Sequence, residues 1–126
     1  MESLRILNSY LLTLLLTTSS ILGQDQNNIF SPVTNTVESY VLKNRKVRVN
    51  LDASDGDDNP LTIEITEDAL NGSINIYGTV LEYQPNSDFI GSESLSYRAF
   101  DGKNYSNISS INLYIIDAPN QLSFAN

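Results

Sequence analysis

Apolar and polar residues alternate along most of the chain, a pattern typical of strands with one buried face. The alternating apolar positions are Val47, Val49 and Leu51, then Leu61, Ile63 and Ile65, Ile74 and Ile76, Leu81 and Tyr83, Leu95, Tyr97 and Ala99, and Ile111, Leu113 and Ile115. Turn residues separate these runs, as at Asn71-Gly72 and Asp101-Gly102, and no helical spacing is sustained. With a leading strand within residues 29–42, the pattern predicts an all-β sandwich of about seven strands.

The first 23 residues have the pattern of a removable signal peptide. Arg5 precedes an apolar stretch that ends near the small residue Gly23, which is the layout of an export signal. A membrane anchor is the alternative, and the polar residues inside the stretch disfavour it. We therefore expect a signal peptide at 1–23, an N-terminal segment and candidate first strand at 24–39, one sandwich domain at 40–117, and a linker or tail at 118–126.

Composition narrows the chemistry available to this domain. The 126 residues include no Cys, His or Trp, and their formal net charge is −8. Thiol and imidazole catalysis and the common zinc sites are therefore excluded, and the net negative charge argues against nucleic acid as a partner. A glycosidase pair such as Glu64 and Glu82 is disfavoured because the alternation turns both outward, so we expect no enzyme. The net negative charge instead favours a cation as the ligand.

One turn between two strands concentrates acidic side chains. This acidic loop, residues 53–60, holds Asp55, Asp57, Asp58 and Asn59. Oxygen ligands at alternating positions suit Ca²⁺, which accepts six to eight oxygens in irregular geometry. An EF-hand is excluded, because Pro60 and Thr66 stand where that motif needs Gly and a bidentate Glu. The alternative is a solvated turn, since Asp, Asn, Gly and Pro are the common turn residues.

Five stretches spread over residues 40–119 carry a family resemblance through their order and spacing. They are residues 47–65 around Asp-Gly-Asp-Asp-Asn, then residues 71–74, 83–91, 94–102 and 115–119. On these stretches the chain resembles the cadherin-like, immunoglobulin-like tandem repeat domains of bacterial surface and extracellular proteins. The resemblance implies an immunoglobulin-like Greek-key β-sandwich that occurs in rows, with Ca²⁺ stiffening the junctions. The ligands it implies are Asp55, Asp57, Asn59, Asp101 and Asp117.

The resemblance and the charge together predict a secreted or cell-surface, non-catalytic module for adhesion or structure, stiffened by Ca²⁺ at its acidic end. Its expected partners are neighbouring domains or surface proteins, with glycans as an open alternative. We expect no nucleic acid as a partner, and no membrane insertion once the leader is cleaved. The alternative function is a carbohydrate-binding module of the β-sandwich type, in which an exposed Tyr77 or Tyr105 stacks on sugar rings.

A basic cluster has two interpretations. It consists of Lys43, Arg45, Lys46 and Arg48. The first interpretation is a docking patch for an acidic polymer or a neighbouring acidic domain. The second is the outward side of a strand that protects a sheet edge, and the interleaving with Val47 and Val49 favours this one.

Overall fold

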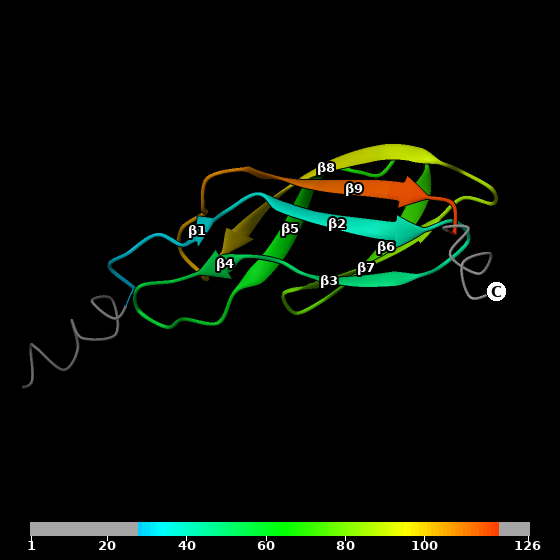
Figure 1. The fold of residues 1–126 in the computed structure, drawn as a ribbon. Helices are drawn as coiled ribbons and strands as arrows, with labels where there is room; N and C mark the ends of the chain where they lie inside the picture. Colours follow the sequence, from blue (N-terminus) through cyan, green and yellow to red (C-terminus); the bar gives the residue numbers. More distant parts are fainter. Residues whose placement is uncertain (1–27, 119–126) are drawn as a thin grey trace, which may run out of the picture.

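A computed structural model describes residues 28–118 of the chain. The predicted leader at 1–23 and residues 119–126 of the predicted tail lie outside the described residues. The described part consists of strands, turns and loops, packed as a sandwich (Figure 1). No helix within residues 28–118 is long and apolar enough to cross a membrane. The all-β sandwich predicted from the alternation is confirmed.

Nine strands build the two sheets and a short ribbon of the described chain. They are β1 (Val33–Thr34), β2 (Val37–Leu42), β3 (Val47–Asn50), β4 (Ala53–Ser54), β5 (Thr62–Glu67), β6 (Gly72–Tyr77), β7 (Val80–Pro85), β8 (Gly91–Phe100) and β9 (Ser109–Ile116). The sheet orders are β2-β9-β8-β5 and β3-β7-β6, and β1 pairs with β4. Because β1 and β4 are two-residue extensions of the strands that they adjoin, the architecture agrees with the predicted seven strands.

The leading strand joins the two sides of the sandwich. Its first segment, β1, pairs antiparallel with β4, and its second segment, β2, pairs parallel with β9. All other strand pairs are antiparallel. Figure 1 shows β1, β4 and the end of β8 at one end of the molecule, and the ends of β2 and β9 at the other. We call the first the acidic end, because the acidic loop follows β4 there.

The core lies between the inward faces of the two sheets. The alternation singled out all of its buried residues except Val41; the set is Val41, Val49, Leu51, Ile63, Leu81, Tyr83, Leu95, Tyr97, Ala99, Ile111, Leu113 and Ile115. Burial of each large apolar side chain contributes roughly 1.5–3 kcal/mol to stability. A slip of one residue in any strand would turn its apolar side outward, so the core fixes the register.

The Tyr97 hydroxyl connects this core to polar backbone at its rim. The Tyr97 hydroxyl lies 2.6 Å from the carbonyl oxygen of Asn35 and 3.0 Å from that of Asp52. It therefore ties the leading strand to the residue that enters β4. At the acidic end the side-chain amide of Asn107 adds a second tie, because it accepts the N–H of Thr34 and donates to the carbonyl oxygen of the same residue.

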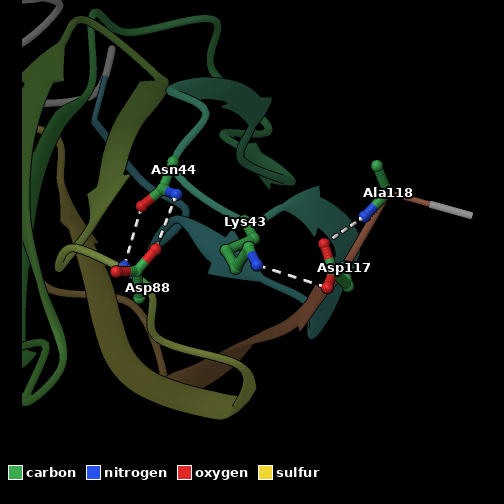
Figure 2. A network of polar contacts seen from close by, with 5 residues as sticks. All are labelled: Lys43, Asn44, Asp88, Asp117 and Ala118. Atoms are coloured by element: carbon green, nitrogen blue, oxygen red, sulfur yellow. Dashed lines mark hydrogen bonds and ion pairs between the residues drawn. The ribbon is translucent and has the colours of Figure 1, made fainter.

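The opposite end is closed by side-chain contacts between loops (Figure 2). Asn44 and Asp88 both have positive φ, 64° and 62°, a conformation that Asn and Asp tolerate better than most residues. The Asn44 amide donates to Asp88 Oδ1 at 3.1 Å, and the backbone N–H of Asp88 donates to Asn44 Oδ1 at 2.8 Å. Lys43 Nζ lies 3.2 Å from Asp117 Oδ2. These contacts join the β2–β3 turn to the β7–β8 loop and to the end of β9.

The basic cluster lies along β3 and the turn before it. β3 is an edge strand of the three-stranded sheet, which agrees with the second interpretation of the cluster. The register points Glu82 of β7 outward, as predicted, yet Glu82 is buried because Lys46 and Arg48 cover its carboxylate.

A buried carboxylate, Glu93, organises the loop between β5 and β6. Its oxygens accept the backbone N–H groups of Leu70 and Asn71 at 2.8 and 2.6 Å. The Tyr83 hydroxyl donates to the same carboxylate at 3.2 Å. One acidic side chain therefore satisfies three donors at the edge of the core.

Replacement of Glu93 by Ala should destabilise the domain by about 3 kcal/mol, because it leaves several buried donors without an acceptor. Equilibrium urea unfolding measures the change. The matched control is Glu67→Ala, because Glu67 is exposed and accepts one hydroxyl, that of Ser96. Equal losses of stability in the two variants would show that Glu93 does not organise the loop.

Stability should also decline in alkali. Burial raises the pKa of Tyr83, and the neighbouring Glu93 raises it further. The folded protein therefore favours the neutral hydroxyl, and this contribution is complete below about pH 10, the ordinary pKa of tyrosine, and is lost as the pH rises above it. The urea midpoint should fall from pH 9 to pH 11.5, and it should fall less in Tyr83→Phe. Identical slopes would contradict the prediction.

Candidate metal centre

The acidic loop and the turn after β8 meet at the acidic end of the sandwich. The acidic loop follows β4, and Asp101 directly follows the last residue of β8. The Asp101 carboxyl contacts the side chains of Asp55 and Asn28. Two loops far apart in the sequence thus place two carboxylates side by side, together with an amide from the N-terminal segment.

The Asp55 carboxylate uses one oxygen to shape the acidic loop. Its Oδ1 accepts the backbone N–H of Asp57 at 2.7 Å and lies 3.4 Å from both the backbone and side-chain nitrogens of Asn59. This is the turn that Asp residues commonly form with backbone groups that follow them. The other oxygen, Oδ2, is buried and has no hydrogen-bond partner within the described chain.

The Asp101 carboxylate has the same division of roles. Its Oδ1 accepts the backbone N–H groups of Lys103 and Asn104 at 2.7 and 2.6 Å, and its Oδ2 is buried without a hydrogen-bond partner among residues 28–118. The side chain is 93% buried, with 7% of its surface exposed. Burial raises the pKa of Asp101, but these backbone N–H groups, together with contacts to the Asn28 and Asp55 side chains, outweigh burial and hold the pKa below its usual range. The carboxyl is therefore ionised at neutral pH.

These two unpartnered oxygens fit a cation. An unpaired buried charge is costly, and a positive ion between two carboxylates removes that cost. The side-chain oxygen of Asn28 lies nearby, since it accepts the Asn104 amide at 3.2 Å. No group of three acidic, His or Cys side chains that could hold a metal occurs in the described part of the chain. An ion here would complete its coordination with neutral oxygens or water, which Ca²⁺ accepts readily.

Asp57 has a different role from Asp55. Its Oδ2 accepts the backbone N–H groups of Ile29 and Phe30 at 2.7 and 2.8 Å. The Phe30 ring covers Gly56 so closely that a Cβ atom at that glycine would lie 3.1 Å from it. Asp57 therefore anchors the N-terminal entry of the domain across the acidic loop. No local pattern in residues 28–30 indicates that they belong to this site.

The other predicted ligands divide between the two ends of the molecule. Asn59 lies in the acidic loop and directs its amide nitrogen toward Asp55. Asp117 follows β9, whereas Asp101 lies before it, and an eight-residue strand spans about 25 Å. Asp117 instead pairs with Lys43, and hydrogen bonding to Lys43 holds the pKa of Asp117 below its usual range. The structure thus brings together Asp55, Asp57, Asn59 and Asp101, but not Asp117.

The topology defines an immunoglobulin-like β-sandwich. A family model described as a bacterial Ig domain matches residues 27–114, so the chain belongs to the bacterial Ig domain family. The match includes β1 and β2 within the domain, and it confirms the resemblance found in the sequence. No curated protein matches the chain.

Solved structures with the same fold come from different kinds of protein. An endo-fucoidan hydrolase of glycoside hydrolase family 107 aligns with 71% of this chain at 16% identity and a TM-score of 0.57, and the chain spans 14% of that protein. A segment of human mucin-like protocadherin, EC1-2, aligns with 72% of this chain at 13% identity and a TM-score of 0.50, over 55% of its own length. At these identities the similarity shows the fold alone.

Removal of the Asp57 carboxylate should loosen the N-terminal entry while the sandwich stays folded. Asp57→Ala should lower stability by about 1 kcal/mol, because the two backbone N–H groups lose the carboxylate that accepts them and bond to water instead. Chymotrypsin should then cleave after Phe30 faster, because local opening exposes that bond.

Asp58→Asn is the matched control for this prediction. Asp58 is exposed and has a φ of 57°, which Asn also tolerates. Its cleavage rate should equal that of the unchanged chain. Equal rates in Asp57→Ala and the unchanged chain would refute the anchoring role.

Proposed function

We propose that the chain is a non-catalytic structural or adhesive module of a secreted or cell-surface protein, and that its acidic end binds a Ca²⁺ ion. The observation that carries this proposal is the pair of buried oxygens of Asp55 and Asp101 that have no hydrogen-bond partner within residues 28–118. The signal-peptide pattern of residues 1–23 and membership of the bacterial Ig domain family support the extracellular assignment.

Two residues would hold the ion directly. Asp55 and Asp101 each offer one free oxygen while the second oxygen is fixed by backbone N–H groups, so both carboxylates are oriented before the ion arrives. Oxygen donors suit Ca²⁺, and the neutral amide of Asn28 lies at the same place. Mg²⁺ is less suitable, because it keeps most of its water and needs regular octahedral geometry.

A bound Ca²⁺ ion would supply positive charge to the acidic end. The entry segment lies against this charge, because Asn28 contacts Asp101 while Ile29 and Phe30 are held by Asp57. Neutralisation of Asp55 and Asp101 would remove their mutual repulsion and hold the turn after β8 against the acidic loop. The entry segment, residues 28–30, would then be held firmly against the acidic end of the sandwich. The function proposed is therefore mechanical and depends on stiffness at the domain entry.

Calcium should raise the melting temperature of the purified chain. A ligand at one hundred times its Kd stabilises the folded state by about 2.7 kcal/mol, which for a domain of this size corresponds to roughly 10 °C or more. Differential scanning calorimetry in EDTA, in Ca²⁺ and in Mg²⁺ measures the shift. A comparable increase in Mg²⁺ would refute the assignment to Ca²⁺.

The variant Asp101→Asn should stay folded and lose calcium binding, so it tests the ion site without disturbing the fold. In EDTA this variant should melt at a higher temperature than the unchanged chain, because the amide relieves charge repulsion and donates to Asp55. Its melting temperature should no longer respond to Ca²⁺. Asp117→Asn is the control at the opposite end and should keep the full response. A response retained by Asp101→Asn, or lost equally by Asp117→Asn, would refute the proposed site.

A further inference from the structure

Basic side chains gather on the outer face of the three-stranded sheet. The register places outward side chains in rows across the strands: Arg48, Glu82 and Asn75, then Asn50, Val80 and Tyr77, and, with Lys46 just before β3, Gln84 and Ser73. We call this surface the basic face. It measures roughly 10 by 13 Å between backbone positions.

The basic face has more positive than negative charge. Lys46 Nζ lies 3.2 Å from Glu82 Oε1, and Arg48 Nε lies 3.1 Å from Glu82 Oε2. One carboxylate therefore faces two cations. The basic face therefore has a net positive charge, in a chain whose formal net charge is −8.

These groups are accessible and of mixed chemistry. The side chains of Arg48 and Lys46 are 70% and 55% exposed, and Tyr77 is 55% exposed. The Arg48 guanidinium lies 5.7 Å from the centroid of the Tyr77 ring, so a fixed cation and an aromatic ring share one surface. Asn75 and Gln84 add amide donors and acceptors on the same side.

We propose that the basic face binds an anionic polysaccharide, whose sugars carry sulfate or carboxylate groups. A guanidinium binds either group through paired hydrogen bonds, and Lys46 adds a point charge. The Tyr77 ring offers an apolar surface to the C–H side of a sugar, with its hydroxyl at the edge. The amides of Asn75 and Gln84 can bond sugar hydroxyls. An open sheet face suits an extended polymer.

A sugar explains the basic face better than an acidic polypeptide does. Positive charge attracts either partner. The Tyr77 ring and the amides of Asn75 and Gln84, however, have no groups to bind on a purely acidic polypeptide. At physiological salt the Debye length is about 8 Å. Acidic side chains farther away than this are largely screened, so the positive charge of the basic face governs the binding of an anion there. This inference is independent of the calcium site, which lies beyond the other end of β3.

Binding is measured with the full chain in EDTA, by biolayer interferometry against immobilised polymers. Dextran sulfate and hyaluronan provide sulfate and carboxylate groups, and neutral dextran and poly-glutamate are the comparison polymers. We expect binding to one or both anionic sugars, at least tenfold weaker binding by neutral dextran and poly-glutamate, and a preference that identifies the anionic group. Binding of neutral dextran or poly-glutamate as tight as that of the anionic sugars would overturn the proposal, and so would no binding at all.

Three variants locate the interaction. Arg48→Gln combined with Lys46→Gln should weaken binding at least tenfold, and Tyr77→Ala at least threefold. Glu82→Gln should strengthen binding severalfold, because it removes the carboxylate that pairs with both Lys46 and Arg48. Circular dichroism establishes that each variant is folded. Since misfolding cannot produce tighter binding, Glu82→Gln keeps the test decisive if the double variant fails to fold, and unchanged or weaker binding by folded Glu82→Gln would overturn the proposal.

Arg98→Gln is the matched control. Arg98 lies on the other sheet with a similar environment, 2.8 Å from Glu64 and 3.8 Å from the centroid of the Tyr105 ring. Glu64 neutralises it one to one, and the Tyr105 ring also packs against Phe100. Binding should be unchanged in this variant. A loss equal to that of the double variant would show that the polymers bind by general charge attraction and would overturn the proposal.

Discussion

The close approach of two carboxylates is the constraint on which the acidic end depends. Asp55 and Asp101 each commit one oxygen to backbone N–H groups, and within residues 28–118 the other oxygen is buried without a hydrogen-bond partner. Several contacts hold this end of the sandwich together. Tyr97 ties the leading strand to the residue before β4, and Asn107 ties β1 to the turn after β8. The fold therefore maintains a pair of carboxylates that, under the proposed function, a cation would join.

The chain also enters the domain at this acidic end. Because Asp57 anchors Ile29 and Phe30 while Asn28 contacts Asp101, the entry of the domain and the proposed ion site are parts of one polar network. A change in ion occupancy is thus expected to act on the entry segment, residues 28–30. The sandwich itself, with its separate apolar core, should change little.

Much of the fold follows from the sequence, because alternation with a period of two determines which residues face the core. The inward runs of β3, β5, β7, β8 and β9 were all identified in this way. The acidic loop and Asp101 were also identified as candidate ligands. The roles within the loop were not, since neighbouring Asp57 and Asp55 differ only in which backbone groups approach them. Asp117 was grouped with them by resemblance, but its position after β9 places it at the other end.

Long-range contacts account for what the sequence left open. Asn28 and Glu82 lie in stretches whose local pattern gives no sign of their partners, 73 residues away in the case of the Asn28 contact with Asp101. Glu82 has an outward register, and only the neighbouring strand shows that two cations cover it. Such pairings are set by the topology of the sheets and not by local preference.

The central claim is that Asp55 and Asp101 form a Ca²⁺ site, and equilibrium dialysis with radioactive calcium tests it most directly. The account predicts one bound ion for each chain and no binding above background in Asp101→Asn. The absence of bound calcium in the unchanged chain at millimolar concentration, or equal binding in Asp101→Asn, would contradict it.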